Sequence, residues 1–261
     1  MPTASNDGVT LQYVTDGAGP TVVFCGEAGL GAWLWSYQLG GLPPTVETLV
    51  WEYRGTGRSD APPGPYSVET LVADLDSVLA DHGARSIHLV GAGLGGQVAV
   101  EYARDHGRAD TLTLFGTPRS PADIDADALD RVWADPGDAG ALRSSLSTLF
   151  APETVASHPE EMDRIVGWRR EDDADAEGWN AQRAALCDHT LTDCYEVTTP
   201  ALVCHGTEDA VVDPAAGEAL AEALPNGTHR AVDGGHCAFV ESAQAVTDTL
   251  VGHLEDAGAF E

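Results

Sequence analysis

The sequence has no lysine and only three isoleucines, and all 13 of its basic residues are arginines. Aspartate and glutamate together number 42, which gives the 261-residue chain a formal net charge of −29. A protein with so little positive charge repels nucleic acid and anionic lipid surfaces, so we expect neither as a partner. The ordinary fractions of apolar (43%) and charged (21%) residues exclude wholesale disorder.

The acidic residues form many short groups rather than one anionic tail. Examples lie at 74–76, 160–163 and 171–173. A surface of this kind suits a solvent in which salt screens self-repulsion, because the Debye length falls to about 3 Å at about 1 M salt. The lysine-free, aspartate-rich pattern resembles proteins of halophiles that accumulate salt. An acidic cytosolic protein is the alternative.

The sequence also lacks a membrane-length apolar run and an N-terminal targeting signal. Its cysteine count is odd, at five, and several of the cysteines lie in apolar runs, which favours reduced thiols and a cytoplasmic location. Cys187, His189 and Cys194 lie close together but match no zinc-binding spacing. We therefore expect no metal and no cofactor, and the sequence does not indicate an oligomeric state.

Short apolar runs alternate with amphipathic segments along the chain. The predicted strands are 10–15, 21–25, 48–53, 86–90, 111–115, 201–204 and 228–232. Most of these runs are continuously apolar, which is typical of parallel strands buried on both faces. Helical periodicity is predicted at 68–81, 94–106, 214–223 and 242–254, with Ser67 as an N-cap. The alternation predicts an α/β fold with a mostly parallel, twisted sheet flanked by helices.

The segment 118–199 breaks this alternation. It contains no convincing strand but four helical stretches, at 123–133, 140–149, 159–170 and 174–187. An insertion between two parallel strands would lie over the carboxyl ends of the sheet. We predict a core formed by 1–117 and 200–261, with 118–199 as an inserted helical cap.

A glycine-rich turn follows the predicted strand 86–90. The segment 91–96 reads Gly-Ala-Gly-Leu-Gly-Gly, which also satisfies the G-x-G-x-x-G pattern of dinucleotide-binding loops. A dinucleotide site would require this loop near the first strand and an acid at the end of the next one. Three predicted strands precede the loop, and the next strand ends in Leu114-Phe115, so the dinucleotide interpretation is disfavoured.

Together with four other motifs, this turn resembles the G-x-S-x-G nucleophile elbow of the α/β-hydrolase superfamily. The segment 24–29 resembles its oxyanion loop, and 53–60 its R-G-x-G-x-S turn. The segments 200–209 and 234–237 resemble the loops that carry the triad acid and histidine. The order of elbow, acid and histidine is that of the superfamily, whose small capped enol-lactonases and carboxylesterases are the most similar in pattern.

The resemblance implies a site made of Asp209, His236 and the position of the nucleophile, which here is Gly93. Glycine has no nucleophilic side chain, so ordinary serine chemistry should be absent. The resemblance also implies an oxyanion hole formed by the backbone N–H groups of Leu94 and Glu27. The carboxylate of Glu27 could act as a base or be a surface group.

These residues leave three hypotheses open. The first is a hydrolase of a small carbonyl compound, an ester or lactone, in which a water at the position of the missing hydroxyl is activated by His236 and Asp209. The second is a ligand-binding or sensor protein without turnover. The third is cofactor-free lyase, isomerase or oxygenase chemistry with the same histidine as base. Cys237 and His205 are expected to be structural residues.

Overall fold

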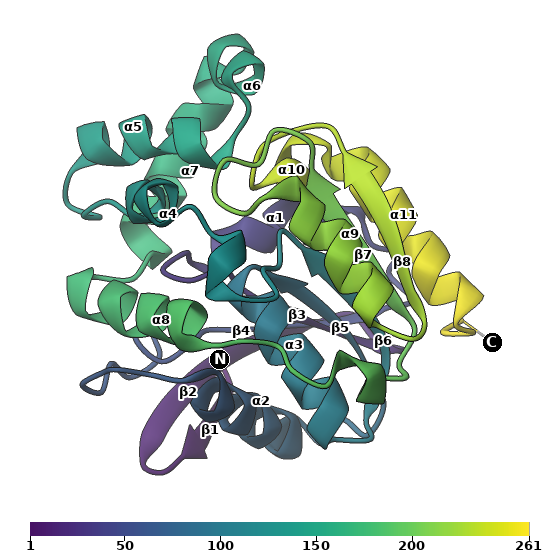
Figure 1. Ribbon diagram of the computed structural model, residues 1–261. Coiled ribbons are helices and arrows are strands. Elements are labelled where there is room, and N and C mark those ends of the chain that lie inside the picture. The colour runs from purple at the N-terminus through teal and green to yellow at the C-terminus, as the bar shows by residue number, and fades with distance from the viewer. Residues whose placement is uncertain (261) are drawn as a thin grey trace.

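The computed structural model describes residues 1–260, and its centre is an eight-stranded sheet in the order β1-β2-β4-β3-β5-β6-β7-β8 (Figure 1). β1 and β2 are antiparallel to their neighbours, and the other strands run parallel. The strands are β1 (Thr3–Asn6), β2 (Val9–Asp16), β3 (Thr21–Cys25), β4 (Glu47–Trp51), β5 (Ile87–Ala92), β6 (Ala109–Phe115), β7 (Ala201–Gly206) and β8 (Gly227–Val232).

The continuously apolar runs form the interior of this sheet, as their pattern predicts. Every residue of β3, β5 and β7 is buried, which requires helices on both faces. All seven predicted strands are present, and the predicted fold class is confirmed. β1 escaped prediction because it has four residues, of which Ala4 alone is buried.

Helices cover both faces of the sheet (Figure 1). α1 packs against α11 on one face, and α2 packs against α3 on the other. Ser67 caps α2 as predicted, because its hydroxyl accepts a hydrogen bond from the backbone N–H of Thr70 at 3.2 Å. The helices of this layer are α1 (Ser36–Gly41), α2 (Val68–His82), α3 (Leu94–Asp105), α9 (Pro214–Ala223), α10 (Ala238–Glu241) and α11 (Ala243–Asp256), with the 3-10 helix η1 (Ala32–Trp35).

The segment between β6 and β7 contains helices and no strand, apart from an isolated β-bridge between Ile124 and Val212. Its helices are η2 (Pro121–Asp123), α4 (Ala126–Val132), α5 (Ala139–Leu149), α6 (Pro152–Ser157), α7 (Pro159–Asp172), α8 (Ala176–Asp188) and η3 (Cys194–Glu196). The four predicted helices correspond to α4, α5, α7 and α8, and α6 is a six-residue addition with no buried residue. In Figure 1 this group lies beside the sheet, with α5, α6 and α7 projecting beyond it. We retain 118–199 as the proposed extent of the cap.

A buried ion pair ties α7 to the segment that follows β3. The Arg169 guanidinium donates to Asp173 at 2.6 Å and to the Ser145 hydroxyl at 2.6 Å, and its side chain is fully buried. The second oxygen of Asp173 accepts from the indole of Trp33 at 2.7 Å and from the backbone N–H of Gly31 at 3.0 Å. Burial raises the pKa of Asp173 against the lowering effect of Arg169.

Replacing Asp173 with Asn should therefore destabilise the protein by about 3 kcal/mol, because it leaves the buried Arg169 charge uncompensated. Denaturant unfolding at high salt measures the change. Asp130→Asn is the matched control, since Asp130 pairs with Arg183 on the surface and its loss should cost about 0.5 kcal/mol or less. An equal loss of stability in the two variants would contradict the stabilising role of the buried Arg169–Asp173 ion pair.

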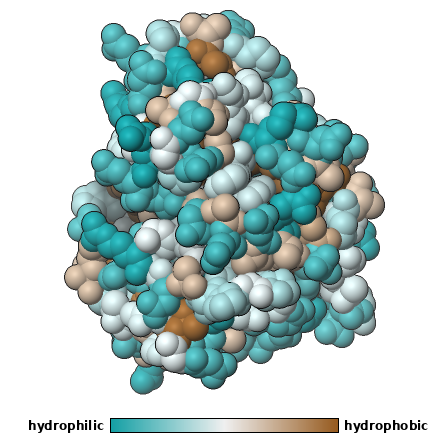
Figure 2. Space-filling view, turned by 90° about the vertical axis from the view of Figure 1, so that its left-hand side faces the viewer, coloured by the Kyte–Doolittle hydropathy of each residue, from teal (hydrophilic) through white to brown (hydrophobic). Residues whose placement is uncertain are grey.

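The surface is strongly hydrophilic, and only scattered apolar residues interrupt it on the face drawn in Figure 2. Within residues 1–260, no helix combines the length and apolarity needed to cross a bilayer. The net charge of −29 makes the folded chain repel itself when salt is low.

We expect the melting temperature to rise steeply as KCl is increased from about 0.1 M to about 2 M, because the shortened Debye length suppresses this repulsion. Thermal unfolding monitored by circular dichroism tests the expectation. A melting temperature that is unchanged across this range would refute adaptation to a saline solvent.

Candidate active site

The glycine-rich turn connects β5 to α3, and Gly93 is its central residue. Gly93 has φ 47° and ψ −109°, a backbone conformation that glycine adopts easily and other residues only under strain. Its N–H donates to the carbonyl of Phe115 at 2.9 Å. A Cβ at Gly95 would overlap the carbonyl of Cys25, so the glycine at position 95 lets α3 approach β3 closely. These close approaches explain the glycine spacing of the turn.

The space beside Gly93 is filled by the carboxylate of Glu27. A Cβ built on Gly93 would overlap Oε2 of Glu27, whose side chain reaches across from the loop after β3. Glu27 is only 2% exposed, so it is not a surface acid. The space that a side chain at position 93 would enter is therefore occupied by this carboxylate.

The other oxygen of Glu27 receives two backbone hydrogen bonds. Oε1 accepts from the N–H of Ala28 at 2.6 Å and from the N–H of Leu94 at 3.2 Å. Two N–H groups that converge on one oxygen are the arrangement that stabilises an oxyanion. The N–H of Leu94 is one of the two donors named from the sequence, and in this structure the N–H that meets it on Oε1 is that of Ala28.

His236 links Glu27 to Asp209. Its Nε2 lies 3.0 Å from Oε2 of Glu27, and its Nδ1 lies 2.9 Å from Oδ2 of Asp209. Asp209 is held by the backbone N–H groups of Val211 and Val212 at 2.8 and 3.0 Å. The structure thus brings Gly93, Glu27, His236 and Asp209 together, as the motif order predicted.

His205 is a further member that the sequence analysis did not assign to the site. Its Nε2 lies 3.1 Å from Oδ2 of Asp209 and 3.2 Å from the carbonyl of Val212. The side chain is buried, and it contacts the same oxygen of Asp209 that Nδ1 of His236 contacts. The spacing of four residues between His205 and Asp209 was visible in the sequence, but their contact depends on the loop after β7.

Two carboxylates face the imidazole of His236, and they determine its charge. Burial alone would lower the pKa of His236, but Asp209 and Glu27 outweigh burial and raise the pKa to about 10. Burial would raise the pKa of Asp209, but His236 and His205 hold it well below its usual value. The direction of this shift favours the protonated imidazolium at neutral pH, the form of His236 that can donate a proton.

The family of the chain follows from a comparison with known proteins. A model of the alpha/beta hydrolase family matches residues 22–249, which include all the residues described above. The chain belongs to the alpha/beta hydrolase family.

Three similar proteins match this chain over nearly their whole length. "Putative carbamate hydrolase RutD" of Stutzerimonas stutzeri is 26% identical over 251 residues, covering 91% of this chain and 92% of that protein. The 3-oxoadipate enol-lactonase 2 of Acinetobacter baylyi is 24% identical, covering 93% and 92%. The crystal structure of the enol-lactonase from Burkholderia xenovorans LB400 superposes with a TM-score of 0.85 at 26% identity, covering 97% and 100%.

Residues of two helices of the proposed cap hold the loop that follows β3. From α8, the Gln182 amide accepts from the N–H of Gly29 at 2.7 Å and donates to the carbonyl of Arg54 at 2.9 Å. From the end of α7, Asp173 accepts from Gly31. The Tyr53 hydroxyl adds a bond to the carbonyl of Gly26 at 3.0 Å. The position of Glu27 therefore depends on residues distant in sequence.

The five cysteines of this chain are free thiols. Cys237 adjoins His236, but burial raises its pKa well above the ordinary value. Burial likewise raises the pKa of Cys25 to about 12. Among residues 1–260, no group of three or more His, Cys, Asp or Glu side chains is arranged to hold a metal.

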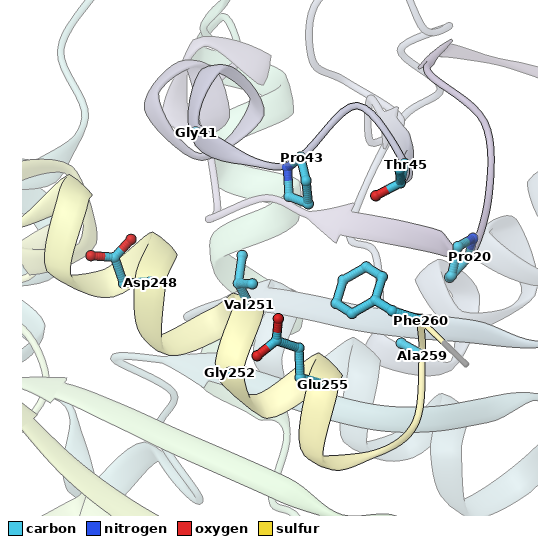
Figure 3. A pocket seen from close by; sticks show the side chains of 10 residues that line it. All are labelled: Pro20, Gly41, Pro43, Thr45, Asp248, Val251, Gly252, Glu255, Ala259 and Phe260. Atoms are coloured by element: carbon cyan, nitrogen blue, oxygen red, sulfur yellow. The ribbon is translucent and has the colours of Figure 1, made fainter.

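A large cavity lies elsewhere on this alpha/beta hydrolase. It measures about 800 Å³ and lies between α11 and the segment around Pro43, with Phe260 directed into it (Figure 3). Pro20 on its wall precedes β3, whereas the Glu27 loop follows β3, so the two features are at opposite ends of that strand. Its ionisable lining groups are Asp248 and Glu255, with no basic partner.

The charge of His236 can be tested by nuclear magnetic resonance. We expect its ring to remain protonated near neutral pH and to lose the proton near pH 10, and Glu27→Gln should lower this pKa. Because the folded-state pKa lies above the ordinary 6.5, the associated stability is fully present below about pH 6.5 and is lost as the pH rises through about 10. A His236 that titrates at or below its ordinary value would contradict the imidazolium assignment.

Proposed function

We propose that the protein is a hydrolase of a small carbonyl compound, an ester or lactone, in which Glu27, His236 and Asp209 form the working triad. Gly93 takes the family's nucleophile position. The observation that carries the proposal is that one carboxylate both fills this position and reaches the catalytic histidine, with Oε2 of Glu27 at 3.0 Å from Nε2 of His236. The names of the relatives refer to a carbamate and to enol-lactones, which are small carbonyl compounds.

The roles follow from charge and geometry. Glu27 is the base or nucleophile, because it is the carboxylate that occupies the side-chain space of the family's nucleophile position. His236 first acts as an acid that protonates the leaving oxygen, since its raised pKa gives it a proton to donate. Asp209 orients the imidazole through Nδ1. The N–H groups of Leu94 and Ala28 stabilise negative charge on the oxygen between them.

This assignment changes the hypothesis drawn from the motifs alone, in which His236 and Asp209 activate a water directly. In the resting site that water would compete with a carboxylate clamped by three hydrogen-bond donors. Lyase, isomerase or oxygenase chemistry with His236 as a resting base needs a neutral imidazole, which a pKa of about 10 disfavours. A binding protein without turnover differs from a hydrolase in one measurable respect, which is turnover that depends on Glu27.

Hydrolysis of p-nitrophenyl acetate and of a simple lactone at about 2 M KCl tests the proposal. We expect measurable turnover by the native chain and a decrease of about 10²-fold or more in Glu27→Gln and in His236→Ala, as is typical when an acid–base group is removed. Glu27→Gln preserves the shape of the side chain, so its folding should be intact, and circular dichroism verifies this.

The matched control is Glu101→Gln. Glu101 is also a buried glutamate that pairs with a histidine, His189, at 2.9 Å, but it lies on α3 outside the site. Its replacement should leave the rate unchanged. Turnover at the native rate in Glu27→Gln would refute the triad. If the native chain turned over neither substrate faster than His236→Ala does, the result would favour a binding protein.

A further inference from the structure

We propose that Glu27 acts covalently: Oε2 accepts the acyl group of the substrate, and water then attacks Cδ of Glu27 itself. This inference rests on the proposed function and specifies its chemistry. It follows from the position of Oε1, which lies between the N–H groups of Ala28 and Leu94 while Oε2 lies beside Gly93. The oxyanion hole therefore holds an oxygen of the protein.

The carboxylate is held in this orientation at both of its oxygens. Oε1 has its two N–H donors, and Oε2 has Nε2 of His236 at 3.0 Å. Placing a substrate carbonyl in the hole would require Oε1 to give up both bonds in a site that is almost fully buried. Charge-assisted hydrogen bonds of this kind are costly to break. We therefore assign the hole to the glutamyl carbonyl.

In the first step Oε2 forms a bond to the carbonyl carbon of the substrate, and the bond from that carbon to the leaving oxygen or sulfur breaks. The leaving atom takes the proton from Nε2 of His236. The products are a mixed anhydride between Glu27 and the acyl group, a neutral His236 and the released alcohol or thiol. Glu27 has then lost its negative charge, so one of the two carboxylates that raise the pKa of His236 is removed.

In the second step the neutral His236 takes a proton from water, and the hydroxide adds to Cδ of Glu27. Negative charge develops on Oε1, which faces Ala28 and Leu94, and removing one such donor typically costs 10²–10³-fold in rate. The Cδ–Oε2 bond then breaks, and the acyl group leaves as a carboxylate that contains the original Oε2. Glu27 retains the oxygen of the water and loses the remaining proton to solvent, while His236 is again an imidazolium.

This order of events also restricts the substrate. The first addition receives no help from the oxyanion hole, because Oε1 fills it, so the substrate itself must be activated. We infer an acyl compound with a good leaving group, such as an enol lactone, an aryl or enol ester, or a thioester. Unactivated alkyl esters should react far more slowly.

Oxygen-18 water tests the covalent step. Enzyme in excess over p-nitrophenyl acetate reacts in labelled water, so that each site turns over once, and the peptides are then analysed by mass spectrometry. We expect one oxygen-18 atom in the Glu27 peptide and none in the acetate from this first turnover. Label in the acetate with an unlabelled Glu27 would overturn the covalent step.

Glu101 provides an internal control in the same digest, because it is a buried glutamate with a histidine partner and should remain unlabelled. Enzyme without substrate, and the His236→Ala variant, should also show no label at Glu27. Turnover that depends on Glu27 but leaves it unlabelled would contradict covalent catalysis while leaving the hydrolase intact. Absence of Glu27-dependent turnover would overturn both.

Discussion

The site depends on one carboxylate that satisfies three hydrogen-bond donors at once. Glu27 accepts from Ala28 and Leu94 with one oxygen and pairs with His236 through the other. Without it, two inward-facing N–H groups and Nε2 of the buried His236 would lose this partner, which is costly in a low-dielectric interior. This position of the Glu27 carboxylate requires a glycine at position 93, because any side chain there would collide with the carboxylate.

In the mechanism that we propose, the reactive group lies on the loop after β3 instead of the turn after β5, and this changes the order of protonation in the site. In an ordinary triad with a neutral serine, Asp209 would be the one carboxylate beside His236. In this site Glu27 adds a second carboxylate, which favours the protonated imidazole ring. The cycle that we propose therefore begins with His236 as an acid and uses it as a base only after Glu27 has been acylated. The cap enters this balance through Gln182 and Asp173, which hold the loop that carries Glu27.

Much of this arrangement could be predicted from the residues. Continuous apolar runs located seven strands, and the order of Gly93, Asp209 and His236 along a parallel sheet was enough to assemble them at one edge. Glu27 was a candidate base or a surface group, and the sequence could not decide between the two, because the answer depends on where a flexible side chain points after a tight turn. The contact of the Ala28 N–H with the Glu27 carboxylate likewise depends on this turn. The contacts of His205 and Gln182 depend on loop geometry and long-range packing, which leave no local pattern.

The central claim is that the Glu27 carboxylate and a side chain at position 93 compete for the same space. A double-mutant cycle tests this claim most directly. We predict that Gly93→Ser alone is destabilised and inactive, because its side chain meets the Glu27 carboxylate. Adding Glu27→Ala to Gly93→Ser should restore stability and raise p-nitrophenyl acetate hydrolysis by orders of magnitude above Glu27→Ala alone, since a serine nucleophile then completes an ordinary triad. A stable and fully active Gly93→Ser variant that retains Glu27 would contradict the account.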